Sequence, residues 1–209
     1  MKRLLHVNAS PRGERSRSGL IGDRILARLS QARPALEIET LDVFDADLPP
    51  FDGQAIEGRY RLLMGQAVPP EQEEAWARIR RWGEHFLSFD AWLFTVPMWN
   101  FGLPYRLKHY VDVLTHPGVT FRNDAQGDVE GLAAGRTAII VAASAMPIEA
   151  GGPLAHLDFQ LAYMKAWLGF IGVTDIRALR IAPTFGPPEA VEALMAEMAI
   201  QADALARAL

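Results

Sequence analysis

Residues 3–29 read RLLHVNASPRGERSRSGLIGDRILARL and join two periodic patterns through a polar turn. The apolar run at 3–7 is typical of a buried strand, and the apolar spacing after residue 19 is typical of a helix. The turn between them, NASPRGERSRSG (8–19), holds three serines, three arginines and two glycines. Such a turn can bind an anion, because the free amides and the positive end of the helix dipole point at it. The segment therefore predicts an α/β protein with a phosphate-like ligand at its first turn.

The rest of the chain repeats this alternation of strand and helix. Further strand-like runs occupy residues 36–41, 91–96, 137–142 and 175–181. Helical spacing is predicted at residues 19–31, 70–88, 104–114, 154–169 and 188–208. Alternation of this kind favours right-handed crossovers and a parallel sheet that helices cover on both faces. We predict a doubly wound five-stranded parallel sheet in one domain over residues 1–209, since no linker or internal repeat divides the chain.

Two segments have no clear period. Residues 45–69 are rich in proline, glycine and charge, and they are predicted to form a long surface excursion before the second helix. Residues 118–131 read GVTFRNDAQGDVEG, where a β-prone run is followed by turn residues, so we predict a hairpin or an extended lobe. Long loops in compact domains are often functional lids or walls.

Composition argues against several classes of protein. A formal net charge of -4 disfavours a nucleic-acid binder. The absence of cysteine removes disulfides and thiol chemistry and is compatible with the cytoplasm, where we expect the protein to reside. The apolar run at the N-terminus is too short for a signal peptide, and no stretch is long enough to span a membrane. The histidines lack metal-ligand spacing and no GxSxG is present, so neither a metal site nor a serine hydrolase is predicted.

Ligands of open parallel sheets bind at the carboxyl ends of the strands, which directs attention to the loops there. The first loop contains neither GxxxxGK[ST] nor GxGxxG, so it is not a Walker or dinucleotide turn. Ser10, Ser16 and Ser18 can converge on a phosphate; alternatively the loop is solvated and Ser18 is a helix N-cap. Its arginines, Arg12, Arg15 and Arg17, either balance a bound phosphate or remain solvated charges.

The loop after the third predicted strand, PMWNFGLP (97–104), places large aromatic groups where a polar loop is expected. Trp99 and Phe101 alternate with the amide of Asn100. Either the aromatic rings cap the core, or they line a flat slot for a planar heterocycle. A phosphate cradle beside such a slot describes a site for FMN rather than FAD, because no GxGxxG turn is available for a pyrophosphate.

Five blocks, in order along the chain, carry a resemblance: SPRGERSRS (10–18), VPMWNFGLPYRLKHYVD (96–112), GVTFR (118–122), EGL (130–132) and LGFIGVTDI (168–176). Together they resemble the FMN-dependent NADH azoreductases, which are flavodoxin-like NADH:quinone oxidoreductases. The resemblance implies a flavodoxin-like fold, FMN as cofactor, NADH or NADPH as electron donor, and a quinone or azo compound as acceptor. It also implies a homodimer with FMN near the subunit interface. Donor and acceptor then use one site in turn, which implies ping-pong transfer of hydride.

The resemblance also implies the site residues. Phosphate contacts fall to Ser10, Ser16 and Ser18, with Arg17 as a balancing charge. Contacts to the ring and the ribityl chain fall to Pro97, Met98, Trp99, Asn100 and Phe101, with Ser144 as a further contact. Phe121 and Asn123 are expected to line the substrate pocket, and Phe121 and Trp167 to lie near the shared flavin pocket. No side chain is assigned a catalytic role.

Three departures from the family pattern are visible. After GVTFR (118–122) many members carry an aromatic residue where this chain has Asn123, so the wall of the substrate pocket is expected to differ. Trp99 stands where members often have tyrosine, and ASAMPIEAGG (143–152) replaces a Ser-Arg-Gly-Gly-like turn, so flavin contacts there are expected to differ. Two alternatives to an enzyme of this kind stay open. A non-enzymatic flavodoxin-like electron carrier would usually be more acidic. A hydrolase lacks both a metal cluster and a nucleophile motif in this sequence.

Overall fold

The computed structural model describes residues 1–124, 126–148 and 151–209, and its centre is a five-stranded parallel sheet. The strands of this sheet are β1 (Arg3–Asn8), β2 (Glu37–Asp42), β3 (Ala91–Pro97), β6 (Thr137–Ala143) and β7 (Asp175–Ile181). Their order, β2-β1-β3-β6-β7, is the flavodoxin-like doubly wound order. The predicted fold class is confirmed.

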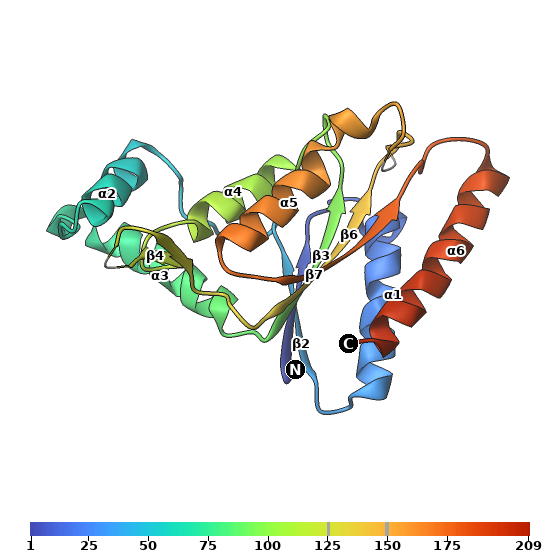
Figure 1. The fold of residues 1–209 in the computed structure, drawn as a ribbon, viewed down its shortest axis with the longest axis horizontal. Coiled ribbons are helices and arrows are strands. Elements are labelled where there is room, and N and C mark those ends of the chain that lie inside the picture. Colours follow the sequence, from blue (N-terminus) through green and yellow to red (C-terminus); the bar gives the residue numbers. More distant parts are fainter. Residues whose placement is uncertain (125, 149–150) are drawn as a thin grey trace.

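Helices cover both faces of the sheet (Figure 1). One face carries α1 (Arg17–Ala32) and α6 (Pro188–Arg207), and the other carries α3 (Glu73–Leu87), α4 (Tyr105–Leu114) and α5 (Phe159–Phe170). Short 3-10 turns stand at Gly13–Arg15, Pro70–Gln72 and Ala155–Leu157. Because successive strand residues point to opposite faces, Leu4 and Leu5 of β1 enter different apolar cores. Within the described ranges, no helix has the length and apolar character needed to cross a membrane.

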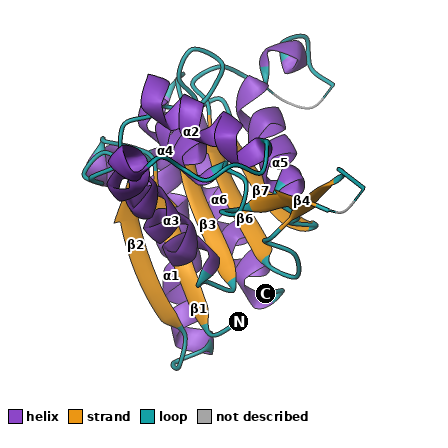
Figure 2. Cartoon of the chain, turned by 90° about the vertical axis from the view of Figure 1, so that its left-hand side faces the viewer, coloured by secondary structure: helices purple, strands orange, loops and turns teal. Residues whose placement is uncertain are grey.

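One prediction about this architecture is wrong. Residues 45–69 are not wholly irregular, because they contain α2 (Gly53–Leu63), which lies outside α3 (Figures 1 and 2). Asp52 caps this helix, accepting hydrogen bonds from the amides of Gln54 at 3.0 Å and Ala55 at 3.1 Å. Gly58 lets the helix approach Trp76, since a Cβ there would lie 2.1 Å from the indole Nε1. The sequence did not reveal this helix, because its buried residues are the small Ala55 and Gly58.

Residues 118–131 contain the predicted hairpin, formed by β4 (Phe121–Asn123) and β5 (Val129–Gly131). A backbone contact fixes it to the end of α5. A Cβ on Gly131 would lie 2.1 Å from the carbonyl carbon of Ile171, and the carbonyl of Ile171 accepts a bond from the Ala133 amide at 2.8 Å. This close packing of the hairpin on the end of α5 therefore requires glycine at position 131.

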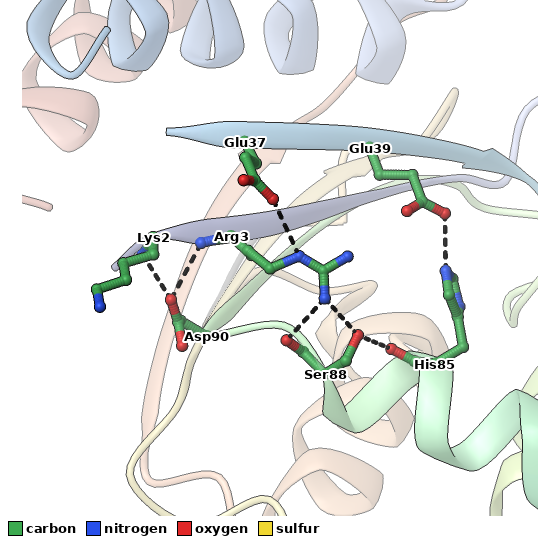
Figure 3. Close-up of polar contacts among 7 residues, drawn as sticks. All are labelled: Lys2, Arg3, Glu37, Glu39, His85, Ser88 and Asp90. Atoms are coloured by element: carbon green, nitrogen blue, oxygen red, sulfur yellow. Dashed lines mark hydrogen bonds and ion pairs between the residues drawn. The ribbon is translucent and has the colours of Figure 1, made fainter. Parts of the chain in front are cut away.

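A polar network closes the amino-terminal edge of the sheet (Figure 3). The carboxylate of Asp90 accepts hydrogen bonds from the amides of Lys2 and Arg3, which hold its pKa below the ordinary value. The guanidinium of Arg3 donates to the Ser88 hydroxyl at 2.8 Å and lies 3.4 Å from Glu37. These contacts bind the starts of β1 and β2 to the end of α3, at the edge opposite the loops of interest.

Helices α1 and α6 are clasped by one carboxylate. Asp203 accepts hydrogen bonds from Arg24 at 2.8 Å and from Arg28 at 3.0 Å. These two guanidinium groups lower the pKa of Asp203. These contacts join α6 to α1, the helix that begins at the serine-rich turn.

Candidate cofactor site

The loops at the carboxyl edge of the sheet surround one hollow of about 130 Å³, which we name the carboxyl-edge hollow. Its lining residues are Ser10, Arg12, Ser16, Arg17, Ser18, Pro97, Met98, Trp99, Ala143, Ala145 and Thr184. The structure thus brings the serine-rich turn together with the start of the aromatic loop. It adds Thr184 after β7, which the sequence analysis missed, although a fifth parallel strand must end at the same edge.

Ser10 marks the inner end of the turn. Its residue is only 2% exposed, and among the described residues its hydroxyl oxygen has no hydrogen-bond partner. A buried polar group without a partner costs roughly 1–3 kcal/mol, so native proteins rarely keep one without a reason. A phosphate in the hollow would accept a hydrogen bond from this hydroxyl.

Ser16 and Ser18 stand where α1 begins. The hydroxyl of Ser16 accepts a hydrogen bond from the Gly19 amide at 3.1 Å, so Ser16 is the N-cap, and the alternative that gave this role to Ser18 is wrong. Ser18 is 1% exposed, and its hydroxyl lies 3.3 Å from that of Ser16. Two buried hydroxyls at the positive end of a sixteen-residue helix form an environment for an anion.

Two cations stand beside these serines. Arg12 and Arg17 line the hollow, and Arg15 does not belong to its lining. A guanidinium is charged at every physiological pH and can meet phosphate oxygens with two donors at once. Arg12 is exposed and also borders the hollow, so both roles given to it from the sequence stay open.

The aromatic loop is a tight turn with a strained centre. Trp99 and Gly102 exchange backbone hydrogen bonds of 3.1 and 2.9 Å, and the residues between them, Asn100 and Phe101, have φ of 47° and 70°. Positive φ at both central positions is the type I′ turn, which asparagine accepts and phenylalanine does not favour. Such strain often marks a functional site.

The rings of this loop are neither core nor fully solvated. Trp99 is 36% exposed and Phe101 is 39% exposed. The indole of Trp99 packs on the ring of Phe44, with centroids 5.7 Å apart, and less closely on Tyr105. This exposure disfavours the alternative in which the rings cap the core, and Trp99 is one of the residues that line the hollow.

Ser144 is buried, but its hydroxyl is already engaged. It accepts a hydrogen bond from the Met146 amide at 3.2 Å and donates to the Met98 sulfur at 3.6 Å. Its neighbours Ala143 and Ala145 line the hollow in its place. Residues 149 and 150 of the altered 143–152 loop lie outside the described residues.

The hairpin residues lie apart from the hollow in this chain. Phe121 is 3% exposed and packs edge-on against Phe170 with centroids 4.9 Å apart, while Asn123 is exposed. Neither belongs to the lining of the carboxyl-edge hollow. Trp167 is a core residue instead, packed between Phe86 and Phe94.

A larger hollow of about 430 Å³ lies between β2 and α3. Several of its polar side chains already have partners, since Arg78 pairs with Asp47 at 2.9 Å and His85 Nε2 lies 2.7 Å from the Glu39 carboxylate (Figure 3 shows the second pair). In the described part of the chain, no three histidine or carboxylate side chains gather to hold a metal ion. The smaller hollow, with its unpartnered hydroxyl, is the better candidate for a ligand.

Comparison with known proteins agrees with the observed fold, and the matches cover nearly the whole chain. A family described as "Flavodoxin-like fold" matches residues 2–206. The FMN-dependent NADH:quinone oxidoreductase of Nitratidesulfovibrio vulgaris (strain DP4) is 42% identical over 207 residues, which cover 99% of both chains. The chain belongs to this oxidoreductase family. The predicted resemblance is confirmed.

Other members and neighbours of the FMN-dependent NADH:quinone oxidoreductase family support the assignment. FMN-dependent NADH:quinone oxidoreductase 2 of Pseudomonas syringae pv. tomato (strain ATCC BAA-871 / DC3000) is 39% identical over 99% of this chain and 98% of its own. The crystal structure of azoreductase from Bacillus anthracis str. Sterne covers 100% of both chains with a TM-score of 0.88 at 25% identity. The hollow fits the phosphate of the family's cofactor, because it combines the unpartnered Ser10 hydroxyl with a helix N-terminus and two arginines.

Proposed function

We propose that this protein is an FMN-dependent oxidoreductase that carries two electrons from NADH, or from NADPH, to a quinone or an azo compound. The observation that carries the proposal is the buried hydroxyl of Ser10, which has no partner among the described residues and lies on the wall of the carboxyl-edge hollow. A non-enzymatic carrier would use the same cofactor. The net charge of -4 gives little of the acidic surface with which such carriers usually dock.

The serine-rich turn holds the phosphate. Ser10, Ser16 and Ser18 donate hydroxyl hydrogen bonds to its oxygens, and the amides that begin α1 add the positive end of the helix dipole. Arg12 and Arg17 balance the remaining charge from the rim of the hollow. Anchoring at this end leaves the ring system free to lie along the aromatic loop.

The aromatic loop orients the ring. Trp99 and Phe101 provide apolar surfaces that keep water from one side, while Asn100 and the backbone of Pro97 and Met98 provide polar contacts. FMN, when bound, supplies the acceptance and donation of hydride, and the protein supplies binding and orientation. We assign no side-chain acid or base.

A second copy of the chain is proposed to complete the substrate side, as a homodimer in the cytoplasm. Large aromatic groups stand exposed at the mouth of the site, with Tyr105 at 66% beside Trp99 and Phe101. Phe121, Asn123 and Ser144 are proposed to shape the pocket in this assembly, Phe121 and Ser144 after a local rearrangement. Light scattering that gives a fully active monomer at micromolar concentration would contradict the dimer.

The experiment that tests the function starts from the colour of the purified protein. Heat release followed by chromatography should give FMN, and NADH added under nitrogen should bleach the yellow absorbance until a benzoquinone restores it. Rates measured against both substrates should give parallel double-reciprocal lines, as expected for one shared site. FAD as the main pigment, or reduction by NADH without turnover on the quinone, would contradict the proposal.

A further inference from the structure

Asn8 stands at the centre of a row that crosses three strands. It pairs in register with Asp42 of β2 on one side and with Thr95 of β3 on the other. Its side-chain Nδ2 donates to the Asp42 carboxylate at 2.7 Å, and its Oδ1 accepts from the Thr95 hydroxyl at 3.2 Å. One amide thus joins the ends of β2, β1 and β3.

The same amide shapes the turn that follows. Its Oδ1 accepts a hydrogen bond from the Ser10 backbone amide at 3.2 Å, and its Nδ2 lies 3.4 Å from the Ser10 carbonyl. This is the local turn that asparagine side chains form with the backbone two residues on. It sets the place of Ser10, whose hydroxyl lies on the carboxyl-edge hollow.

On the other side, Asp42 carries the connection to the aromatic end of the site. Its second oxygen, Oδ1, accepts a hydrogen bond from the Phe44 amide at 2.8 Å. The ring of Phe44 then packs on Trp99. The chain of contacts from Ser10 through Asn8, Asp42 and Phe44 therefore reaches Trp99.

The hydrogen-bond partners of Asn8 determine which way its side-chain amide points. His6 Nε2 lies 3.0 Å from the Thr95 hydroxyl. Burial lowers the pKa of His6, and the carboxylates of Asp23 and Asp42 oppose this shift. The Ser10 backbone amide can only donate and the Asp42 carboxylate accepts, so the Asn8 amide presents its oxygen to Ser10 and to Thr95 of β3, and its nitrogen to Asp42.

We propose that Asn8 is a positioning residue that fixes the spacing between the phosphate end of the site at Ser10 and its aromatic end at Trp99. Asn8 does not line the carboxyl-edge hollow. It acts through Ser10 on one side and through Asp42 and Phe44 on the other. The inference rests on the proposed function for the identity of the ligand.

The test uses Asn8→Asp and the exchanged pair Asn8→Asp/Asp42→Asn. The single variant places two carboxyl groups where the 2.7 Å hydrogen bond was. A proton shared between them can replace the lost amide donor, and when that proton dissociates the two carboxylates repel each other. We expect the affinity for FMN, measured by quenching of flavin fluorescence, to fall at least about tenfold below wild type at about pH 8 and to recover toward about pH 5. Wild type is measured at each pH, because the phosphate itself titrates near about pH 6.

The exchanged pair keeps the net charge and reverses the donor and the acceptor. It preserves the bonds to the Ser10 amide, Thr95 and the Phe44 amide and loses only the 3.4 Å contact from Asn8 Nδ2 to the Ser10 carbonyl. We therefore expect FMN affinity within about threefold of wild type at both pH values. Gln66→Glu, at an exposed position, adds the same charge as Asn8→Asp and should leave the affinity unchanged. A residue that only stabilised the sheet would change the melting temperature without this pH dependence of binding.

Amide hydrogen exchange on the apoprotein supplies a readout without flavin. At about pH 8, the amides of Ser10 and Phe44 should both exchange faster in Asn8→Asp than in wild type, and the exchanged pair should restore both. Wild-type affinity in Asn8→Asp at that pH, or equal exchange at both amides in all three proteins, would overturn the inference. If wild type binds no FMN, the proposed function fails, and exchange alone decides the role of Asn8.

Discussion

The hydroxyl of Ser16 lies 3.3 Å from that of Ser18, and only the Ser16 hydroxyl is engaged with the helix backbone, as the cap on Gly19. The Ser18 hydroxyl therefore has capacity for a ligand, while the start of α1 does not depend on it. This division lets the binding role of Ser18 be tested without removal of the helix cap.

Ser18→Asp should fold and lose FMN. Two unit charges at about 4 Å repel by roughly 4 kcal/mol at an effective dielectric near 20, which weakens binding about a thousandfold. A carboxylate in the first turn of α1 is favourable to the helix itself. We expect a colourless protein with a native circular dichroism spectrum that recovers little colour in excess FMN. Ser30→Asp, at an exposed position of the same helix, should stay yellow. A yellow, active Ser18→Asp protein would show that the turn does not hold the phosphate.

Phe101→Gly should be more stable than Phe101→Ala, which reverses the usual order of these substitutions. Both remove the same ring, but alanine keeps a side chain at φ of 70° and glycine does not. We expect the free energy of unfolding of the glycine variant to be about 1 kcal/mol higher than that of the alanine variant. Urea unfolding of the two apoproteins measures it. At Phe185, which has no positive φ, alanine should be the more stable of the same pair. If the alanine variant is the more stable of the pair at both positions, the backbone at Phe101 is not strained.

Gly131→Ala should destabilise the protein by at least about 2 kcal/mol, because the new methyl group would enter the backbone at Ile171. Gly169→Ala, two residues from the same contact but with open space around it, should be neutral or stabilising by up to about 1 kcal/mol. Denaturant unfolding compares the two. Equal stability of both variants would mean that the hairpin is not held by this close approach.

Lowering the pH should destabilise the protein in part through His116. Burial, and then the charge of Arg59, lowers the pKa of His116 from 6.5 to about 4. The unfolded chain binds this proton first, so the contribution is complete above pH 6.5 and is lost as pH falls toward 4, by at most about 3 kcal/mol. His116→Phe should keep the packing on Trp76 and flatten the dependence by up to about 1.4 kcal/mol per pH unit. The measurement is urea unfolding across this range; parallel curves for both proteins would contradict it.

Alternation and β-prone residues between turn signals were sufficient to predict some elements of the fold. The bounds of β7 and the hairpin at 118–131 follow from local pattern alone. Helix α2 was missed because its buried face consists of Ala55 and Gly58, small residues that give almost no apolar signal. The choice of Ser16 rather than Ser18 as the cap depends on the 3-10 turn before it, and this geometry has no distinct residue pattern.

The site shows the same division. Residue types in two loops predicted a phosphate end and an aromatic end, and the order of parallel strands brings both to one edge. The lining by Thr184 and the engagement of Ser144 with Met98 depend on contacts between loops far apart in the sequence. Only side-chain packing in three dimensions determines such contacts.

The clasp between Asp203 and the arginines of α1 has a consequence for biosynthesis. Arg24 and Asp203 are 179 positions apart, so the helix that follows the serine-rich turn leaves the ribosome long before the helix that packs on it. Until α6 emerges, the apolar cluster that α1 and the sheet share with Met198, Ala202 and Ala206 of α6 is incomplete and partly open to water or to a chaperone. Loading of the cofactor is therefore expected only after α6 has emerged.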